Sequence, residues 1–215
     1  WTIRANLFLI VPTAIVLAGT ADLLVGIVLQ RGAFDDMTAA ETTRTIQLMM
    51  PGLAINAVMG AVMTAIVADK SLPSFGIVST AILTALGARI VIFLFVVERF
   101  ELPGLVLGAA ASMALGLATL FALLLRHWKG LFAWRDAAAL GGIALSGAAA
   151  AAALLGTRIL LAEPLETAFA GKAVILVLSS GAGGLAYLAM AALVRLRETE
   201  LLGDRLFRRR RKAYP

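Results

Sequence analysis

Long apolar runs alternate with short polar segments along the whole chain. Six runs are each long enough, at about 20 mostly apolar residues, to cross the hydrocarbon core of a bilayer as a helix. They occupy residues 5–29, 45–68, 74–97, 104–125, 137–161 and 172–194. The runs are continuous and do not alternate at every second residue, which favours helices over the strands of a β-barrel. The pattern predicts an all-α, polytopic membrane helix bundle with six transmembrane helices.

Short connectors between the runs predict antiparallel neighbours and a chain with four parts. Residues 1–125 would hold four spans of one lobe, residues 126–136 a loop, residues 137–194 two additional spans, and residues 195–215 a basic tail. The chain opens almost directly inside a span, with Trp1 in place of Met. We therefore expect it to be the C-terminal part of a longer polypeptide.

Composition supports the membrane interpretation and narrows the chemistry. Hydrophobic residues make up 61% of the chain and charged residues 15%, against about 25% charged residues in soluble domains. The mean hydropathy is +0.95, which excludes a soluble globular enzyme. Cysteine is absent and His127 is the single histidine, so thiolate and multi-histidine sites are excluded. Asp35 and Asp36 are adjacent and do not form a facing acid–base pair. We expect no enzyme activity, no catalytic residue, no metal and no cofactor.

Basic residues are unevenly distributed about the six spans. Most of the 19 lysines and arginines fall on the side shared by both chain ends. The positive-inside rule places that side, with the C-terminal tail, in the cytoplasm. The run Arg208–Lys212 lies just beyond the last span, and we interpret it as an anchor attracted to anionic lipid, with no nucleic-acid partner.

Arg89 is the one charged residue well inside a predicted span, more than two helical turns before Glu98. A guanidinium in hydrocarbon costs about 2.5–3.5 kcal/mol on insertion scales, so Arg89 should face protein, water or an anionic ligand. Two interpretations stay open: an anion contact in a transport cavity, or a structural role through an acidic partner or the outer surface. Milder polar residues inside spans are expected to hydrogen-bond between helices; they are Asn56, Thr64, Thr80, Thr84 and Thr119.

Small residues are concentrated in the last three spans. In the fourth they recur every four residues and let two backbones approach closely; they are Gly104, Gly108, Ser112 and Gly116. This stripe predicts helix packing within the chain, with a homodimer face as the alternative. The fifth and sixth spans are rich in Gly and Ala, so they either pack tightly or leave a groove for a lipid tail.

The first two spans contain signals that break helices. Pro12 lies inside the first span and Pro51 early in the second, where proline removes a backbone donor. Gly19, Thr20 and Asp22 indicate a break in the first span, with Asp22 capping a short helix at the outer interface. A continuous helix is the alternative. Broken spans in a polytopic protein favour a transporter over a rigid anchor.

Two segments carry a resemblance to a known family. In the first, an internal proline is followed by an Arg-Gly-Ala-Phe segment; in the second, a Gly-Leu element opens a span that closes at an Asp-x-x-x-Pro turn. The residues concerned are Pro12, Arg31, Gly32, Ala33, Phe34, Pro51, Gly52, Asp69 and Pro73. Together the two segments resemble the lipid II flippases of the MurJ (MviN) family, in the MOP exporter superfamily.

The resemblance implies that the chain corresponds to the last six helices of that family, in a bacterial cytoplasmic membrane. It implies flipping of a lipid-linked peptidoglycan precursor, lipid II, for cell-wall synthesis by alternating access. The partners would be an undecaprenyl-linked glycolipid, membrane lipids and the N-terminal half of the same chain, and the last two helices would border a groove for the undecaprenyl tail. Leu86–Ile90 lacks the Asn or acidic groups linked to sodium in some members, which argues against sodium coupling. The alternatives are a related exporter of O-antigen or exopolysaccharide lipid intermediates, and a non-transporting scaffold subunit.

Overall fold

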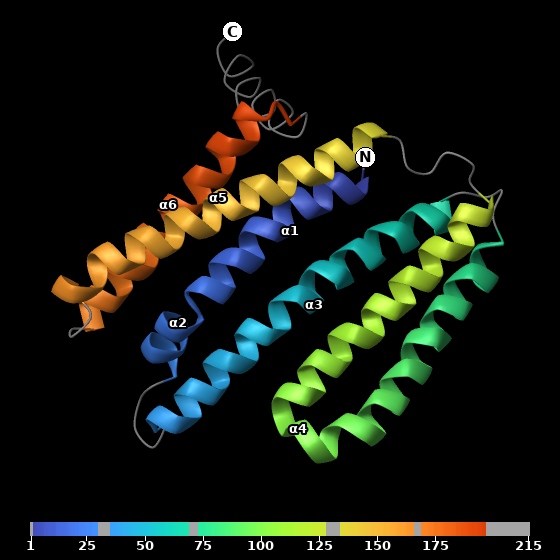
Figure 1. Cartoon of the computed structure of the whole chain (residues 1–215), viewed down its shortest axis with the longest axis horizontal. Coiled ribbons are helices and arrows are strands. Elements are labelled where there is room, and N and C mark those ends of the chain that lie inside the picture. Colours follow the sequence, from blue (N-terminus) through green and yellow to red (C-terminus); the bar gives the residue numbers. More distant parts are fainter. Residues whose placement is uncertain (1, 30–34, 69–72, 128–133, 166–168, 197–215) are drawn as a thin grey trace, which may run out of the picture. The chain divides into compact units, whose positions relative to one another are not determined.

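The computed structural model describes residues 2–29, 35–68, 73–127, 134–165 and 169–196, and every regular element in these ranges is an α-helix (Figure 1). The helices are α1 (Thr2–Gly19), α2 (Ala21–Val28), α3 (Asp36–Ala68), α4 (Ser74–His127), α5 (Trp134–Leu165) and α6 (Phe169–Leu193). Within the described ranges, five helical segments are long and apolar enough to cross a membrane, and the bent pair α1–α2 makes a sixth candidate. The predicted all-α membrane helix bundle is confirmed, and the chain is a multi-pass membrane protein.

The first predicted span consists of two helices. α1 and α2 are bent by 62° at a break next to Thr20. The backbone N–H and the hydroxyl of Thr20 both donate to the Val16 carbonyl, at 3.0 and 2.7 Å, and Gln47 of α3 donates to the Ala18 carbonyl at 3.2 Å. These bonds satisfy carbonyl groups that the end of α1 would otherwise leave without partners. The predicted break is confirmed, but Thr20 stands at the N-cap of α2, while Asp22 lies in its first turn.

α4 is one helical segment that folds back on itself (Figure 1). Its first arm, Ser74–Phe95, and its second arm, Pro103–Arg126, are each long enough to span a membrane. The sequence predicts a connector between two separate helices here, whereas helical structure continues through it in the structure. Pro103 lacks a backbone donor and therefore weakens the helix at the point where the second arm begins.

The chain divides into two compact units, Trp1–Ala133 and Trp134–Pro215. In the first unit, α3 packs against α1, α2 and α4. Its core joins the end of α3 to the start and the end of α4; the buried side chains are Val58, Val62, Ile66, Ile77, Ala81, Leu120 and Leu124. Ile3 and Leu7, near the start of α1, pack against this core. Side-chain packing therefore joins α1, α3 and both arms of α4 in one core.

The entry into α3 is fixed by a capping carboxylate. Asp35, immediately before the helix, accepts a hydrogen bond from the backbone N–H of Thr38 at 2.9 Å. Hydrogen bonds from the side chain and the backbone of Thr38 lower the pKa of the Asp35 carboxyl below its usual 3.8. The ionised carboxylate thus satisfies one of the free donors at the helix start.

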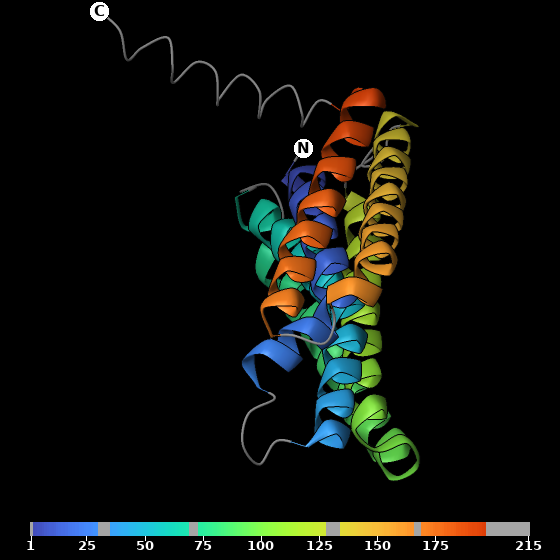
Figure 2. The same ribbon diagram turned by 90° about the vertical axis from the view of Figure 1, so that its left-hand side faces the viewer.

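In the second unit, α5 and α6 lie side by side (Figure 2). A Cβ atom at Gly183 of α6 would lie 3.3 Å from the Ala150 carbonyl oxygen and 3.3 Å from the Leu154 Cβ of α5. Ser146 and Ser179 are fully buried and donate to carbonyls one turn earlier in their own helices. The small-residue faces described here are occupied by helix packing, which favours tight packing over a lipid groove on these faces.

Candidate functional site: a cavity that contains Arg89

A cavity of about 540 Å³ lies between the middle of α3 and both arms of α4. It is lined by Met49, Met50, Gly52, Leu53, Asn56, Arg89, Phe93, Leu105, Val106, Ala109, Ala110 and Met113. A second cavity, of about 340 Å³, adjoins it and shares Asn56, Arg89 and Met113. Both volumes fall in the range of small-molecule binding sites.

The wall that α3 contributes is one face of a helix. Residues three, four and seven positions apart share a helix face, and Met49, Leu53, Asn56, Gly60 and Met63 follow this spacing. All five line one or both cavities. The wall is apolar except for the Asn56 amide.

Arg89 brings the only charge among the side chains that line the two cavities. The side chain is half-buried, and its Nε atom is buried without a hydrogen-bond partner in the described part of the chain. Its guanidinium carbon lies 5.9 Å from the centre of the Phe93 ring, at the outer limit of a cation–π contact. Such a contact compensates little for the lost hydration of the guanidinium. The cavity therefore offers a positive charge to an anion, and one guanidinium donor, Nε, has no partner in the described part of the chain.

The groove adjoins the core of the first unit and is open at the surface. Met63, which lines the second cavity, also packs against the buried core of the first unit. At the other end, Met49 is 54% exposed and Leu105 is 37% exposed, so the larger cavity opens to the surface of the unit. The second cavity is open as well, since Ile82 and Leu86 in its lining are 47% and 51% exposed. The two cavities thus form a groove that lies beside the core and is open at the surface.

Some of the predicted site residues meet at this groove. Gly52 and Arg89 line the larger cavity, and Ser112 lines the smaller one. The Ser112 hydroxyl is turned to its own helix and donates to the Ala109 carbonyl at 2.8 Å.

The rest of the small-residue stripe packs within the chain. A Cβ atom at Gly108 would lie 2.5 Å from Ile92 Cγ2, and one at Gly116 would lie 2.7 Å from Ala85 Cβ. Both neighbours belong to the first arm of α4. Gly104 is buried in the same second arm. A homodimer would have to use the small-residue face of the second arm of α4. The first arm of α4 already covers this face at Gly108 and Gly116.

The residues of the family resemblance are spread over several elements. Pro12 lies inside α1 and Pro51 inside α3. Pro73 precedes α4, and its carbonyl accepts a hydrogen bond from the Ile77 N–H at 3.1 Å. The segment Arg31–Phe34 and Asp69 lie outside the described residues, as do residues 197–215 of the basic tail.

The prediction for the intramembrane threonines was wrong. In the part of the chain that the structure describes, each of the four donates its hydroxyl to a carbonyl one turn earlier in its own helix and not to another helix; they are Thr64, Thr80, Thr84 and Thr119. This bond is available to any threonine inside a helix, so it does not require a partner helix. Asn56, in contrast, is exposed at the cavity.

Sequence reasoning missed the methionines of the groove. Five of the seven methionines line the two cavities; they are Met49, Met50, Met59, Met63 and Met113. The available signal was the spacing of three of the four on α3: Met49, Met59 and Met63 fall within about 80° of one another around the helix, whereas Met50 lies on the side opposite Met59. The fifth lies across the groove on the second arm of α4.

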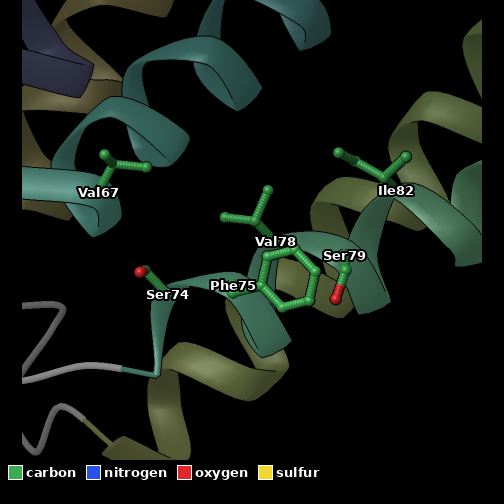
Figure 3. Close-up of a pocket in the computed structure, with 6 residues that line it drawn as sticks. All are labelled: Val67, Ser74, Phe75, Val78, Ser79 and Ile82. Carbon is green, nitrogen blue, oxygen red and sulfur yellow. The ribbon is translucent and has the colours of Figure 1, made fainter.

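A third cavity, of about 320 Å³, lies where α3 ends and α4 begins (Figure 3). Val67 of α3 lies across from Val78 of α4, and Phe75 is 87% exposed beside them. Its polar lining consists of Ser74 and Ser79, without a charged side chain. The groove with Arg89 is therefore the stronger candidate for a binding site.

No protein-family model matches the chain, and no curated protein is significantly similar to it. The described residues contain no group of three or more acidic, histidine or cysteine side chains that could hold a metal ion. The fold defines the class of the protein as a polytopic α-helical membrane protein, and the resemblance to the MurJ family stays a prediction.

Proposed function

We propose that the chain forms part of a transporter that moves a lipid-linked phosphosugar across a bilayer. The expected substrate is lipid II, and the expected membrane is the bacterial cytoplasmic membrane with the C-terminus inside. The observation that carries the proposal is the position of Arg89, a half-buried cation in a cavity whose other lining side chains are uncharged.

A phosphate group fits the chemistry of this cavity. A guanidinium presents several N–H donors in a planar fork that matches phosphate oxygens, and charge-assisted hydrogen bonds of this kind are about twice as strong as neutral ones. The buried Nε of Arg89 has such a donor unused. Apolar side chains around it would exclude water and strengthen the attraction. A transported substrate needs binding and release but no covalent step, so the proposal requires no catalytic residue.

Alternating access would move the substrate along this groove. Met49 and Leu105 line the groove near the start of α3, and both are exposed. In the proposed orientation α3 begins outside, so this part of the groove lies in the outer half of the membrane. An opposite state would need the core at Val62 and Leu120 to separate. The broken span α1–α2 adds a bend of the kind that transporters use near their substrate paths.

A scaffold role through the stripe from Gly104 to Gly116 has less support. Gly108 and Gly116 already contact the first arm of α4, which leaves less of the stripe available to a partner.

Complementation tests the proposal in cells. The full-length protein and its variants are expressed in bacteria depleted of their own lipid II flippase, and growth and lipid II turnover are measured. We expect Arg89→Gln to fail, Arg89→Lys to retain part of the function because it keeps the charge, and Arg126→Gln to behave as the parent protein. Arg126 is the matched control, since it is an exposed arginine near the end of the same helix.

Membrane levels of each variant are compared so that a folding defect is not taken for a loss of transport. Full growth and normal lipid II turnover with Arg89→Gln would reduce Arg89 to a structural residue and remove the main support for the proposal.

A further inference from the structure

We propose that Met49 is a redox-sensitive modification site, and that its oxidation to the sulfoxide gives Arg89 a hydrogen-bond acceptor within the groove. Met49 and Arg89 line the same cavity. The oxidised groove would hold anions less tightly than the unmodified one. The inference adds a form of regulation to the groove, and for its effect on anion binding it rests on the proposed function.

The exposure of Met49 distinguishes it from the other groove methionines, all of which lie in described helices. Its side chain is 54% exposed, whereas the other four are partly buried; they are Met50, Met59, Met63 and Met113. Arg44 precedes Met49 by five residues, or about 7.5 Å of helix, so Met49 lies close to the membrane boundary of its span. An oxidant dissolved in water therefore reaches Met49 before the deeper methionines.

The packing of α4 sets the level of its first arm along α3. α3 and the second arm run in the same direction, because the first arm reverses the chain between them (Figure 1). A Cβ atom at Gly52 of α3 would lie 3.5 Å from Ala110 Cβ of the second arm. A Cβ atom at Gly108, two residues earlier on that arm, would lie 2.5 Å from Ile92 Cγ2. Ile92 is therefore at the level of about residue 50 of α3, next to Met49.

The Arg89 side chain extends toward this level. Its guanidinium carbon lies 5.9 Å from the centre of the ring of Phe93, the residue that follows Ile92. Phe93 lines the same cavity as Met49. The buried Nε of Arg89 has no hydrogen-bond partner in the described part of the chain. An acceptor at Met49 would thus enter the cavity in which this donor lacks a partner.

Oxidation converts the thioether of Met49 into such an acceptor. A peroxide transfers one oxygen atom to the sulfur: a sulfur lone pair forms the S–O bond and the O–O bond breaks. With hydrogen peroxide, the departing hydroxyl takes the proton of the transferred oxygen and leaves as water. Sulfur loses two electrons and the peroxide gains two, so the step needs no further reactant. The sulfoxide oxygen accepts hydrogen bonds and donates none.

Two effects would weaken anion binding in the oxidised groove. The Nε donor of Arg89 would be engaged by the sulfoxide, and the partial negative charge of the sulfoxide oxygen would lie in the cavity that the anion enters. The other lining side chains are uncharged, so this dipole is weakly screened there. Reduction by a methionine sulfoxide reductase restores the thioether, so the change is reversible.

Met37 is the matched control for the modification, since it is 71% exposed on the same helix and does not line the groove. The full chain in phosphatidylcholine nanodiscs is treated with hydrogen peroxide, and mass spectrometry of its peptides gives the oxidation rate of each methionine. We expect Met37 and Met49 to be oxidised several-fold faster than Met59 and Met63. Equal rates at Met49 and Met59 would overturn the inference, because Met49 would then have no preferred access to oxidant.

The ¹⁵N–¹H signal of Arg89 Nε reports the proposed hydrogen bond without any transported substrate, and its loss in Arg89→Gln assigns it. In the Met37→Leu variant, where Met49 is the fast-reacting methionine, we expect this signal to move on oxidation. In the Met49→Leu variant it should stay in place. A signal that does not move when Met49 is fully oxidised, or that moves equally in Met49→Leu, overturns the inference.

Titration with inorganic phosphate separates this inference from the proposed function. We expect oxidation to weaken phosphate binding about tenfold in Met37→Leu, and the affinity of Met49→Leu to be the same before and after oxidation. A sulfoxide reductase should restore the first affinity. An unchanged affinity in Met37→Leu would overturn the regulation. If Arg89→Gln binds phosphate as tightly as the parent chain before oxidation, the proposed function fails, and the Nε signal alone then decides whether oxidised Met49 pairs with Arg89.

Discussion

Gly116 is the position at which the close approach of the two α4 arms can be tested most directly. A Cβ atom placed there would lie 2.7 Å from Ala85 Cβ and 3.1 Å from the Ala81 carbonyl oxygen. Carbon atoms in contact normally lie about 3.5–4.0 Å apart, so Gly116→Ala must push the arms apart by about 1 Å at this level. The atoms that it meets are backbone and Cβ atoms, which cannot turn away as the end of a long side chain can.

The expected cost follows from two opposing terms. Alanine is favoured over glycine inside a helix by about 0.5–1 kcal/mol, whereas overpacking of this kind costs about 1–3 kcal/mol. Gly87→Ala, on the first arm of the same helix, brings the same gain without a clash, since nothing lies within 4 Å of its Cβ position. The helix-propensity gain cancels in the comparison. We therefore expect Gly116→Ala to be about 1–3 kcal/mol less stable than Gly87→Ala.

Unfolding of the purified full chain by sodium dodecyl sulfate, followed by circular dichroism, measures both free energies. Gly108→Ala should fall between the two variants. Its new Cβ meets Ile92 Cγ2 at 2.5 Å, and the isoleucine can turn away only at the cost of leaving its preferred helix rotamer. If Gly116→Ala and Gly87→Ala unfold with the same free energy, the arms are not packed along Gly116 and Ala85, and this reasoning is wrong.

Two further predictions concern the second unit and the orientation in the membrane. Gly183→Leu should lower the free energy of unfolding by about 1–3 kcal/mol, because even its Cβ would lie 3.3 Å from the Ala150 carbonyl oxygen. Gly184→Leu should have little effect in the same assay, since nothing lies within 4 Å of a Cβ atom at Gly184. The chain has no cysteine, so single cysteines report topology without background. We expect Asp36→Cys to react with an impermeant maleimide in intact cells and Arg126→Cys only after permeabilisation; the reverse pattern would invert the proposed orientation.

The helix content and most span positions could be predicted from the sequence because they depend on local hydropathy. A run of about 20 apolar residues has few alternatives to a membrane helix, since backbone groups in lipid must be paired within the segment. The connector before Pro103 was not foreseen as helical, because a charged segment with proline usually marks a span end. Whether residues 98–103 form a loop or continue as helix depends on contacts between the two arms. Hydropathy carries no information about these contacts.

The candidate site was predicted only in part for the same reason. Arg89 stood out because a charge inside an apolar run is costly wherever it points. The methionines did not, because methionine is an ordinary residue of apolar helices and becomes informative only when several share a cavity. The four threonines were assigned to contacts between helices, but the carbonyl of the preceding turn satisfies their hydroxyls at no cost in tertiary structure.

The second arm of α4 connects the stability of the first unit with its groove. Gly108 and Gly116 face the first arm, while Ala109 and Met113 line the larger cavity. One residue corresponds to a rotation of about 100° around a helix, so two adjacent faces of the same arm carry the two roles. The glycine face sets how closely the arms approach, and this distance in turn sets how far Met113 lies from Arg89. Bulk added at Gly116 should therefore change the width of the groove as well as the stability of the unit, although Gly116 does not line the groove.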